Sequence, residues 1–202
     1  MSKPTCIARP GTQKDRMTNY PELKSDCANC QALCCMALAF DRGEKFAEDK
    51  PAGRVCRHLG HGGLCRIHSD LAAQGYQGCV DFDCQGAGQR VVAEVFPGQD
   101  WRKQPRLATA VMEAFRRMRK LHELLVLLKA TEILDLPGNL RGEADDLVAA
   151  LTPVHSADLD WLTGLDLARL EKDVRSFLHR LAPHALGLRD QLQALDRGKQ
   201  AR

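Results

Sequence analysis

The sequence has 202 residues, of which 44% are hydrophobic and 27% are charged, a composition typical of a globular protein and not of a disordered one. The sequence has 29 Lys and Arg residues and 26 Asp and Glu residues, so its net charge is +3. This charge is too small to indicate a nucleic acid or a membrane surface as partner. No run approaches the roughly 18 apolar residues of a membrane-spanning helix, and residues 1–26 lack the apolar segment of a secretory signal, so we expect a cytoplasmic protein.

The first half of the chain is predicted to consist of short helices separated by loops. Polar residues, prolines and a glycine indicate a flexible arm at the N-terminus. Apolar residues and cysteines then recur every three or four positions, as on one face of a helix, and glycine-rich stretches follow. In chain order we predict an arm over 1–21, a helix over 21–40, a loop over 43–63, a short helix over 64–73, an irregular passage over 78–83 and a helix over 84–96.

The second half is predicted to be helical throughout. Seven apolar residues from Leu107 to Leu128 follow alternating spacings of four and three, which predicts an amphipathic helix over 105–134. We expect its basic stretch, Arg116 to Lys120, to form a solvated face or to contact an acidic partner, and we expect His122 to lie on the surface. Further helices are predicted over 141–151, 156–162 (with Ser156 as N-cap) and 166–182, and a helix is possible after Gly187.

The distribution of cysteine divides the chain into modules. All nine cysteines precede residue 85. We therefore predict a flexible arm (1–21), a cysteine-rich metal-binding module (22–96) and a helical module (101–196). No strand pattern occurs anywhere, so the predicted fold class is mainly α: an irregular, metal-bound, cysteine-rich module followed by an all-α helical module.

The cysteines form two clusters whose thiols are candidate metal ligands. In a reducing compartment, clustered thiols most often hold a metal, although single cysteines are usually small buried apolar residues. On a helix, Cys27, Cys30 and Cys34 would share one face, and Cys35 would point away from it, to pack or to serve a second centre. Cys6 stands alone in the arm and is predicted to take no part. The predicted ligands are Cys27, Cys30, Cys34, Cys35, Cys56, Cys65, Cys79 and Cys84.

The identity of the metal stays open between a [4Fe–4S] cluster and Zn²⁺. Eight thiols would complete two four-thiolate sites, or one cubane cluster with spare structural cysteines. Three thiols on one short segment with a distant fourth resemble the way that cubane clusters are held, so we lean slightly to iron–sulfur. His58, His61 and His68 lie among the cysteines as candidate zinc ligands, but the number of thiols makes their coordination unnecessary.

The run CANCQALCC, followed by CRHL, GGLCRIH and GYQGCVDFDC, resembles the zinc/iron-chelating CxxCxxCC domain family of the YkgJ type. The sequence departs from that pattern by one extra residue in the first cluster and by His68 where the family has tyrosine. The segments ALAFDRGEKFAEDKPAG, CVDFDCQGAGQRV, GQDWR and MRKLHELL also resemble the cysteine-rich N-terminal region of bacterial pentapeptide-repeat-containing proteins, over roughly residues 25–180. The pentapeptide repeats themselves are absent, and neither resemblance implies a particular reaction.

Three functions are compatible with these features. We expect a non-enzymatic cysteine-cluster metalloprotein, in which the metal organises a loop-rich fold and the helical module binds a protein partner. The second candidate is a redox or group-transfer enzyme that uses an iron–sulfur cluster; the flagellin lysine methylase is a remote relative in cysteine pattern, but no cofactor-binding motif supports the comparison. The third is a zinc-dependent module that binds nucleic acid, which the small net charge makes least favoured.

Overall fold

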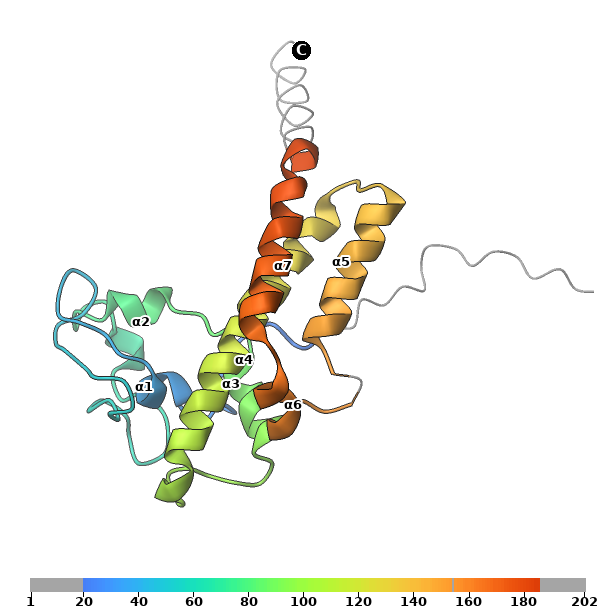
Figure 1. Cartoon of the computed structure of the whole chain (residues 1–202). Helices are drawn as coiled ribbons and strands as arrows, with labels where there is room; N and C mark the ends of the chain where they lie inside the picture. Colours follow the sequence, from blue (N-terminus) through green and yellow to red (C-terminus); the bar gives the residue numbers. More distant parts are fainter. Residues whose placement is uncertain (1–19, 154, 186–202) are drawn as a thin grey trace, which may run out of the picture.

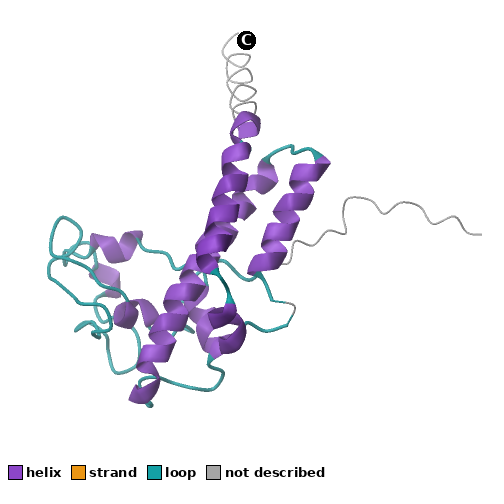
Figure 2. Cartoon of the chain, in the orientation of Figure 1, coloured by secondary structure: helices purple, strands orange, loops and turns teal. Residues whose placement is uncertain are grey.

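The computed structural model describes residues 20–153 and 155–185. In this part of the chain the structure is mainly helical and contains no β-strand, as predicted (Figure 2). Its α-helices are α1 (Leu33–Ala37), α2 (Gln77–Asp81), α3 (Ala87–Arg90), α4 (Ala108–Lys129), α5 (Gly138–Leu151), α6 (Leu159–Gly164) and α7 (Leu167–Arg180). Single helical turns of other pitch are η1 (His68–Asp70), η2 (Val91–Val95, a π-turn), η3 (Pro105–Leu107) and η4 (Ala130–Ile133).

The central element is α4, which η3 precedes and η4 follows without interruption. The predicted long helix over 105–134 is thereby confirmed, with 3₁₀ geometry at its two ends. Its apolar residues at spacings of three and four are buried because other helices cover them on several sides. None of the helices in the described residues is both long and apolar enough to cross a membrane.

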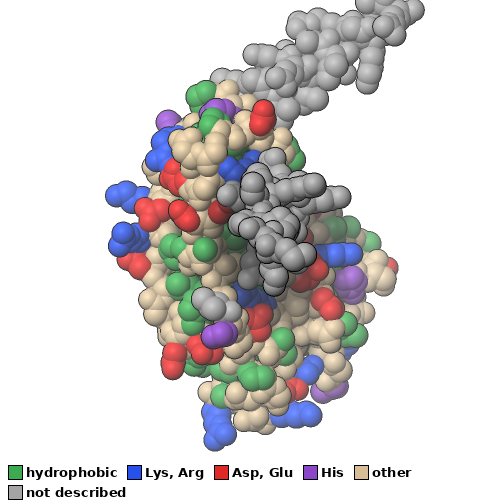
Figure 3. Space-filling model, turned by 90° about the vertical axis from the view of Figure 1, so that its right-hand side faces the viewer, with side chains coloured by type: hydrophobic (Ala, Val, Ile, Leu, Met, Phe, Trp, Pro, Cys, Tyr) green, Lys and Arg blue, Asp and Glu red, His purple; other side chains and the backbone are tan. Residues whose placement is uncertain are grey.

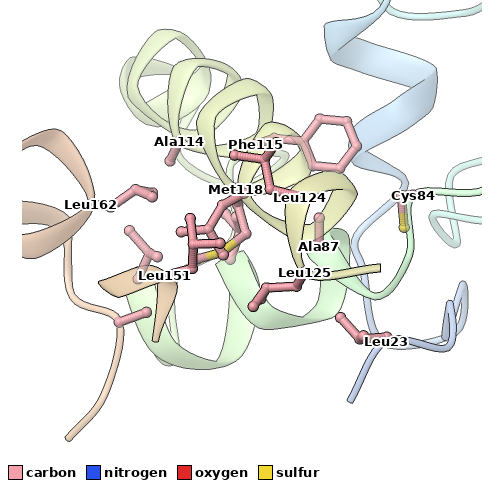
Figure 4. Packing of buried hydrophobic residues seen from close by; sticks show 14 of the residues in the cluster. Leu23, Cys84, Ala87, Ala114, Phe115, Met118, Leu124, Leu125, Leu151 and Leu162 are labelled. Carbon is pink, nitrogen blue, oxygen red and sulfur yellow. The ribbon is translucent and has the colours of Figure 1, made fainter. Parts of the chain in front are cut away.

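The cysteine-rich half and the helical half both pack against α4. Helices α1 and α3 lie against it beside the cysteine-rich loops, while α5, α6 and α7 cover it elsewhere (Figure 1). One cluster of buried side chains runs from Leu23 and Leu33 through α4 to Phe177 (Figure 4). The hydrophobic core is therefore continuous across the predicted boundary between the two modules, and the division of the chain into these modules stays a prediction.

The C-terminal helices begin at aspartate N-caps. The Asp158 side chain accepts a hydrogen bond from the backbone N–H of Trp161, and the Asp166 side chain accepts one from Arg169. Helix α6 therefore begins at Leu159, later than predicted, because Asp158 and not Ser156 caps it. The predicted helices over 141–151 and 166–182 are confirmed as α5 and α7, whereas the predicted helical tail after Gly187 lies outside the described residues.

Three predictions for the cysteine-rich half were wrong in detail. The helix expected over 21–40 is reduced to α1, because Gln31 (φ 51°) and Ala32 (φ 55°) adopt left-handed conformations that interrupt a right-handed helix. The helix expected over 64–73 is only the single turn η1, and a helix, α2, replaces the irregular passage expected over 78–83. The helix predicted over 84–96 is present as α3 continued by the π-turn η2.

Candidate metal centre

Eight of the nine cysteines lie in described residues, and all eight are free thiols. Cys6 lies outside the described part. Loops around α1 and α2 carry most of the eight, at one side of the lower half of α4 in Figure 1. Cys30 and Cys84 are buried, Cys27 and Cys79 are exposed, and the other four are partly exposed. The set therefore extends from the core to the surface.

The first thiol group is assembled from the two ends of the cysteine-rich segment; it consists of Cys27, Cys30, Cys34 and Cys84. Gly88 shows how close two of them lie: a Cβ at this position would stand 3.7 Å from the Cys30 Sγ and 3.8 Å from the Cys84 Sγ. It would also stand 2.8 Å from the Cys30 Cβ, a distance too short for two carbon atoms. Only glycine therefore allows α3 to pack between these thiols.

The segment before Cys27 also holds the first thiol group in place. The Ser25 hydroxyl contacts both the Asp83 carboxylate and, at 3.1 Å, the Cys84 Sγ. The Cys30 thiol in turn donates a hydrogen bond to the Cys27 carbonyl at 3.4 Å. Hydrogen bonds of Ser25 therefore join the segment before Cys27 to residues 83–84, which are far apart from it in sequence.

The second thiol group consists of Cys35, Cys56, Cys65 and Cys79. The Cys56 N–H donates to the Cys35 carbonyl at 3.0 Å, which joins the loop to the end of α1. Residues 56–66 then form a tight reversal, closed by an antiparallel bridge between Leu59 and Cys65. Since Cys34 and Cys35 are adjacent, α1 contributes one thiol to each group.

The electrostatics of the thiols show which of them are neighbours. Burial raises the pKa of Cys30 to about 11, and the charges of Cys34 and Cys27 add to this shift. Burial likewise raises the pKa of Cys79 to about 11, with contributions from Cys34 and two members of its own group. The pKa of Cys34 is raised most of all, first through a hydrogen bond with the Cys35 thiol and then through burial. The charge of Cys34 therefore acts on thiols of both groups.

The described residues contain no group of three Cys, His, Asp or Glu side chains that is already arranged to hold a metal ion. The donor set nevertheless fits a soft metal, because eight reduced thiols are gathered within residues 27–84 without a disulfide. The close approach of Gly88 to two of these thiols shows that Cys30 and Cys84 lie near each other. Ligation would require the remaining thiol side chains to turn toward a common point.

The three histidines among the cysteines lie in different environments. The Nε2 of His58 lies 2.9 Å from the Tyr76 hydroxyl, which donates a hydrogen bond to Glu48 at 2.8 Å. His58 is therefore engaged in a polar contact next to the second thiol group. His61, in a loop, and His68, the first residue of η1, are both exposed. The assignment of all eight cysteines as metal ligands stays a prediction. That the site needs no histidine ligand also stays a prediction.

The sequence did not predict the burial of three basic residues in or beside this region, namely His122, Arg90 and Lys50. His122 was expected on the surface, but it is completely buried in α4. Its position four residues after Met118 and three before Leu125, within the apolar stripe, is the signal that would have placed it inside. Lys50 is 5% exposed and lies in a loop, where no periodic pattern indicates burial.

Comparisons with known proteins give one relative of limited coverage. No family model matches the sequence, and no solved structure matches it. The chain is 38% identical over 122 residues to the uncharacterized protein YybG of Bacillus subtilis strain 168. This alignment covers 60% of the chain and 44% of YybG, so the chain spans less than half of the length of this relative. The resemblance to the YkgJ-type family stays a prediction.

Proposed function

We propose that this protein is a cysteine-cluster metalloprotein that binds an iron–sulfur cluster or zinc through its thiols and acts as an accessory or interaction protein. The observation that carries the proposal is the gathering of eight free thiols around α1 and α2, with Cys30 and Cys84 both beside Gly88. Reduced thiols that are close together in a loop-rich segment suit metals that prefer sulfur ligands.

In this proposal each thiol group holds metal with its own residues. The first group would combine the three thiols of the segment from Cys27 to Cys34 with Cys84, the arrangement of three neighbouring ligands and a distant fourth that suits a cubane cluster. The second group would supply four thiolates from separate segments, as structural zinc sites do. Bound metal would contribute folding free energy to loops that make few contacts with the core.

The role that we propose for the helical half is to bind a protein partner. Some of its basic side chains are already used within the fold, since Arg117 donates to carbonyls at the end of α6 and Lys120 pairs with Glu171. On the part of the face in Figure 3 that the grey residues leave visible, positive and negative side chains are interspersed. These features favour a protein over a nucleic acid, which binds to concentrated positive charge.

Elemental analysis and the ultraviolet–visible spectrum of anaerobically purified protein test the proposal. About four irons per chain with broad absorbance near 400 nm, as thiolate-bound clusters show, would establish an iron–sulfur protein. Zinc in a colourless protein, lost when the thiols are alkylated, would establish the zinc form. Protein that contains neither metal, and takes up neither during anaerobic reconstitution, would refute the proposal.

A further inference from the structure

Lys50 is a buried cation held by backbone oxygens. Its side chain is 5% exposed, and the ammonium donates hydrogen bonds to the carbonyls of Met36 (3.4 Å), Leu38 and Pro51 (3.4 Å). Two of these carbonyls belong to the end of α1 and the residue that follows it. Backbone hydrogen bonds between Phe40 and Lys50, at 3.0 and 2.7 Å, fix the loop that carries the lysine.

The burial of this charge lacks the usual compensation. In the described part of the chain, Lys50 forms no ion pair with a carboxylate, and its ammonium lies 5.6 Å from the centre of the Phe40 ring. Burial lowers the pKa of Lys50, since removing an ammonium from water costs free energy that carbonyl dipoles offset only in part. Lysines are rarely buried to this extent without a negative partner.

Lys50 is held next to backbone that carries thiols of the second thiol group. Met36, whose carbonyl accepts from the ammonium, follows Cys35 directly, and the Cys35 carbonyl accepts from Cys56. The charges that act against the effect of burial on the pKa of Lys50 come from thiolates of the second thiol group and from Cys34. The buried ammonium is therefore bound to the end of α1, the segment that carries Cys35 and that the Cys56 N–H joins to the loop.

Charge balance explains why a cation is useful at this place. A zinc ion with four thiolates carries a net charge of −2, and such a charge is unfavourable in a partly buried site unless positive charge lies nearby. We propose that Lys50 is a positioning residue that supplies the positive charge compensating the metal-bound thiolates of the second thiol group. This inference rests on the proposed function, because it requires metal at these thiols.

The test compares metal affinity in charge-changing and charge-preserving variants. Lys50→Gln removes the charge but keeps amide donors for the carbonyls, and Lys50→Arg keeps the charge. Lys45→Gln is the matched control, since Lys45 is an exposed lysine that pairs with Asp81 at 2.6 Å. The anaerobic apo form of the full chain is titrated with Co²⁺, whose thiolate absorption reports ligation by sulfur, and Zn²⁺ affinity is measured by competition with a chelator.

We expect Lys50→Gln to bind Zn²⁺ about 10- to 100-fold more weakly, the loss typical of groups that support metal ligands, while Lys50→Arg and Lys45→Gln stay close to the wild type. A folded Lys50→Gln protein with wild-type affinity would overturn the inference. Equal weakening in Lys50→Gln and Lys50→Arg would overturn it as well, because the carbonyl contacts and not the charge would then matter. A wild-type protein that binds no metal would refute the proposed function itself, and this inference with it.

A second measurement applies to the wild-type protein if the neutral variant does not fold. The ζ-nitrogen resonance of Lys50, assigned with the Lys50→Arg protein, is recorded by nuclear magnetic resonance in the zinc-loaded chain. An ammonium resonance that shifts when zinc binds supports charge compensation. A neutral amine, or an ammonium resonance unaffected by zinc, would overturn it.

Discussion

The His122 imidazole and the Arg90 guanidinium lie in contact inside the protein, with 3.2 Å between the His122 Nε2 and the Arg90 Nη1. A guanidinium can only donate, so the Nε2 accepts, and the Nδ1–H of His122 donates to the Gln85 carbonyl at 2.5 Å. His122 therefore links α4 to α3 and to the residue that follows Cys84. Gln85 adopts a left-handed conformation (φ 55°), which this hydrogen bond helps to stabilise.

The first prediction is a loss of stability in mild acid. Burial lowers the pKa of His122 to about 4; the charge of Arg90 acts in the same direction, and the hydrogen bond with Gln85 and the charge of Glu94 oppose it. The unfolded chain, in which histidine titrates near pH 6.5, binds the proton first as the pH falls, so the stabilisation by neutral His122 is complete above that pH and declines toward pH 4. This group alone should remove about 2 kcal/mol of unfolding free energy between pH 7 and pH 5.

Urea denaturation of the wild type and of His122→Gln at the two pH values measures this contribution. Gln retains a donor and an acceptor but does not titrate in this range. We expect the variant to be less stable at pH 7 and the difference from the wild type to shrink by about 2 kcal/mol at pH 5. A difference that is the same at both pH values would show that His122 is not held neutral.

The second prediction concerns the glycine between two thiols. Gly88→Ala places a methyl group against Cys30, so we expect the protein to lose about 1–3 kcal/mol of stability and to bind metal more weakly. Gly142→Ala is the matched control in α5, where no atom lies within 4 Å of the added carbon. Because alanine favours a helix, the control should gain up to about 1 kcal/mol. Thermal denaturation and metal titration of both variants check this contrast.

The third prediction separates a ligand from a bystander. Cys30→Ser removes a buried thiol of the first group. Loss of a residue that only supports a ligand weakens metal binding about 10- to 100-fold, and loss of this ligand should weaken it more. Its melting temperature in the presence of metal should fall as well. Cys6→Ser should keep the metal content and melting temperature of the wild type. Metal loss in Cys6→Ser would instead assign the N-terminal arm to the site.

The fourth prediction distinguishes two neighbouring arginines of α4. Arg117 donates to the carbonyls of Leu162 (2.9 Å), Thr163 (3.2 Å) and Leu165 (2.6 Å), so Arg117→Met should cost about 1–3 kcal/mol. Within the described residues, Arg116 pairs only with the exposed Glu113 on its own helix, and Arg116→Met should stay within about 0.5 kcal/mol of the wild type. Chemical denaturation at neutral pH tests both values. Equal effects would mean that Arg117 does not stabilise the end of α6.

The helical half was predictable because its core positions follow one simple repeat. Seven apolar residues from Leu107 to Leu128 follow one another at alternating spacings of four and three. The six of them that lie in α4 are buried. Prolines and glycines marked the ends of α4 and α5. The start of α6 was misplaced because Ser156 and Asp158 are both good N-caps, and only the packing selects between them.

The cysteine-rich half was less predictable, since the spacing of its cysteines has more than one structural solution. Spacings of three and four suit a helix, but they also suit a chain that turns sharply, as it does at Gln31 and Ala32. Neither residue type signals a left-handed conformation. Trp101 supports this turn from a distant part of the sequence by donating to the Gln31 carbonyl at 3.1 Å. Long-range contacts of this kind leave no local pattern.

The distance in sequence between Cys34 and Cys84 also determines when the first thiol group is completed during synthesis. The ribosome releases the cysteines near α1 long before it releases Cys84 and α3, and α3 in turn packs against the still later α4. The nascent chain therefore carries exposed, incompletely assembled thiols until α4 has emerged. During this interval the thiols are open to oxidation and, under the proposed function, to competing metals, so the yield in cells should depend on the redox state during translation more than after folding.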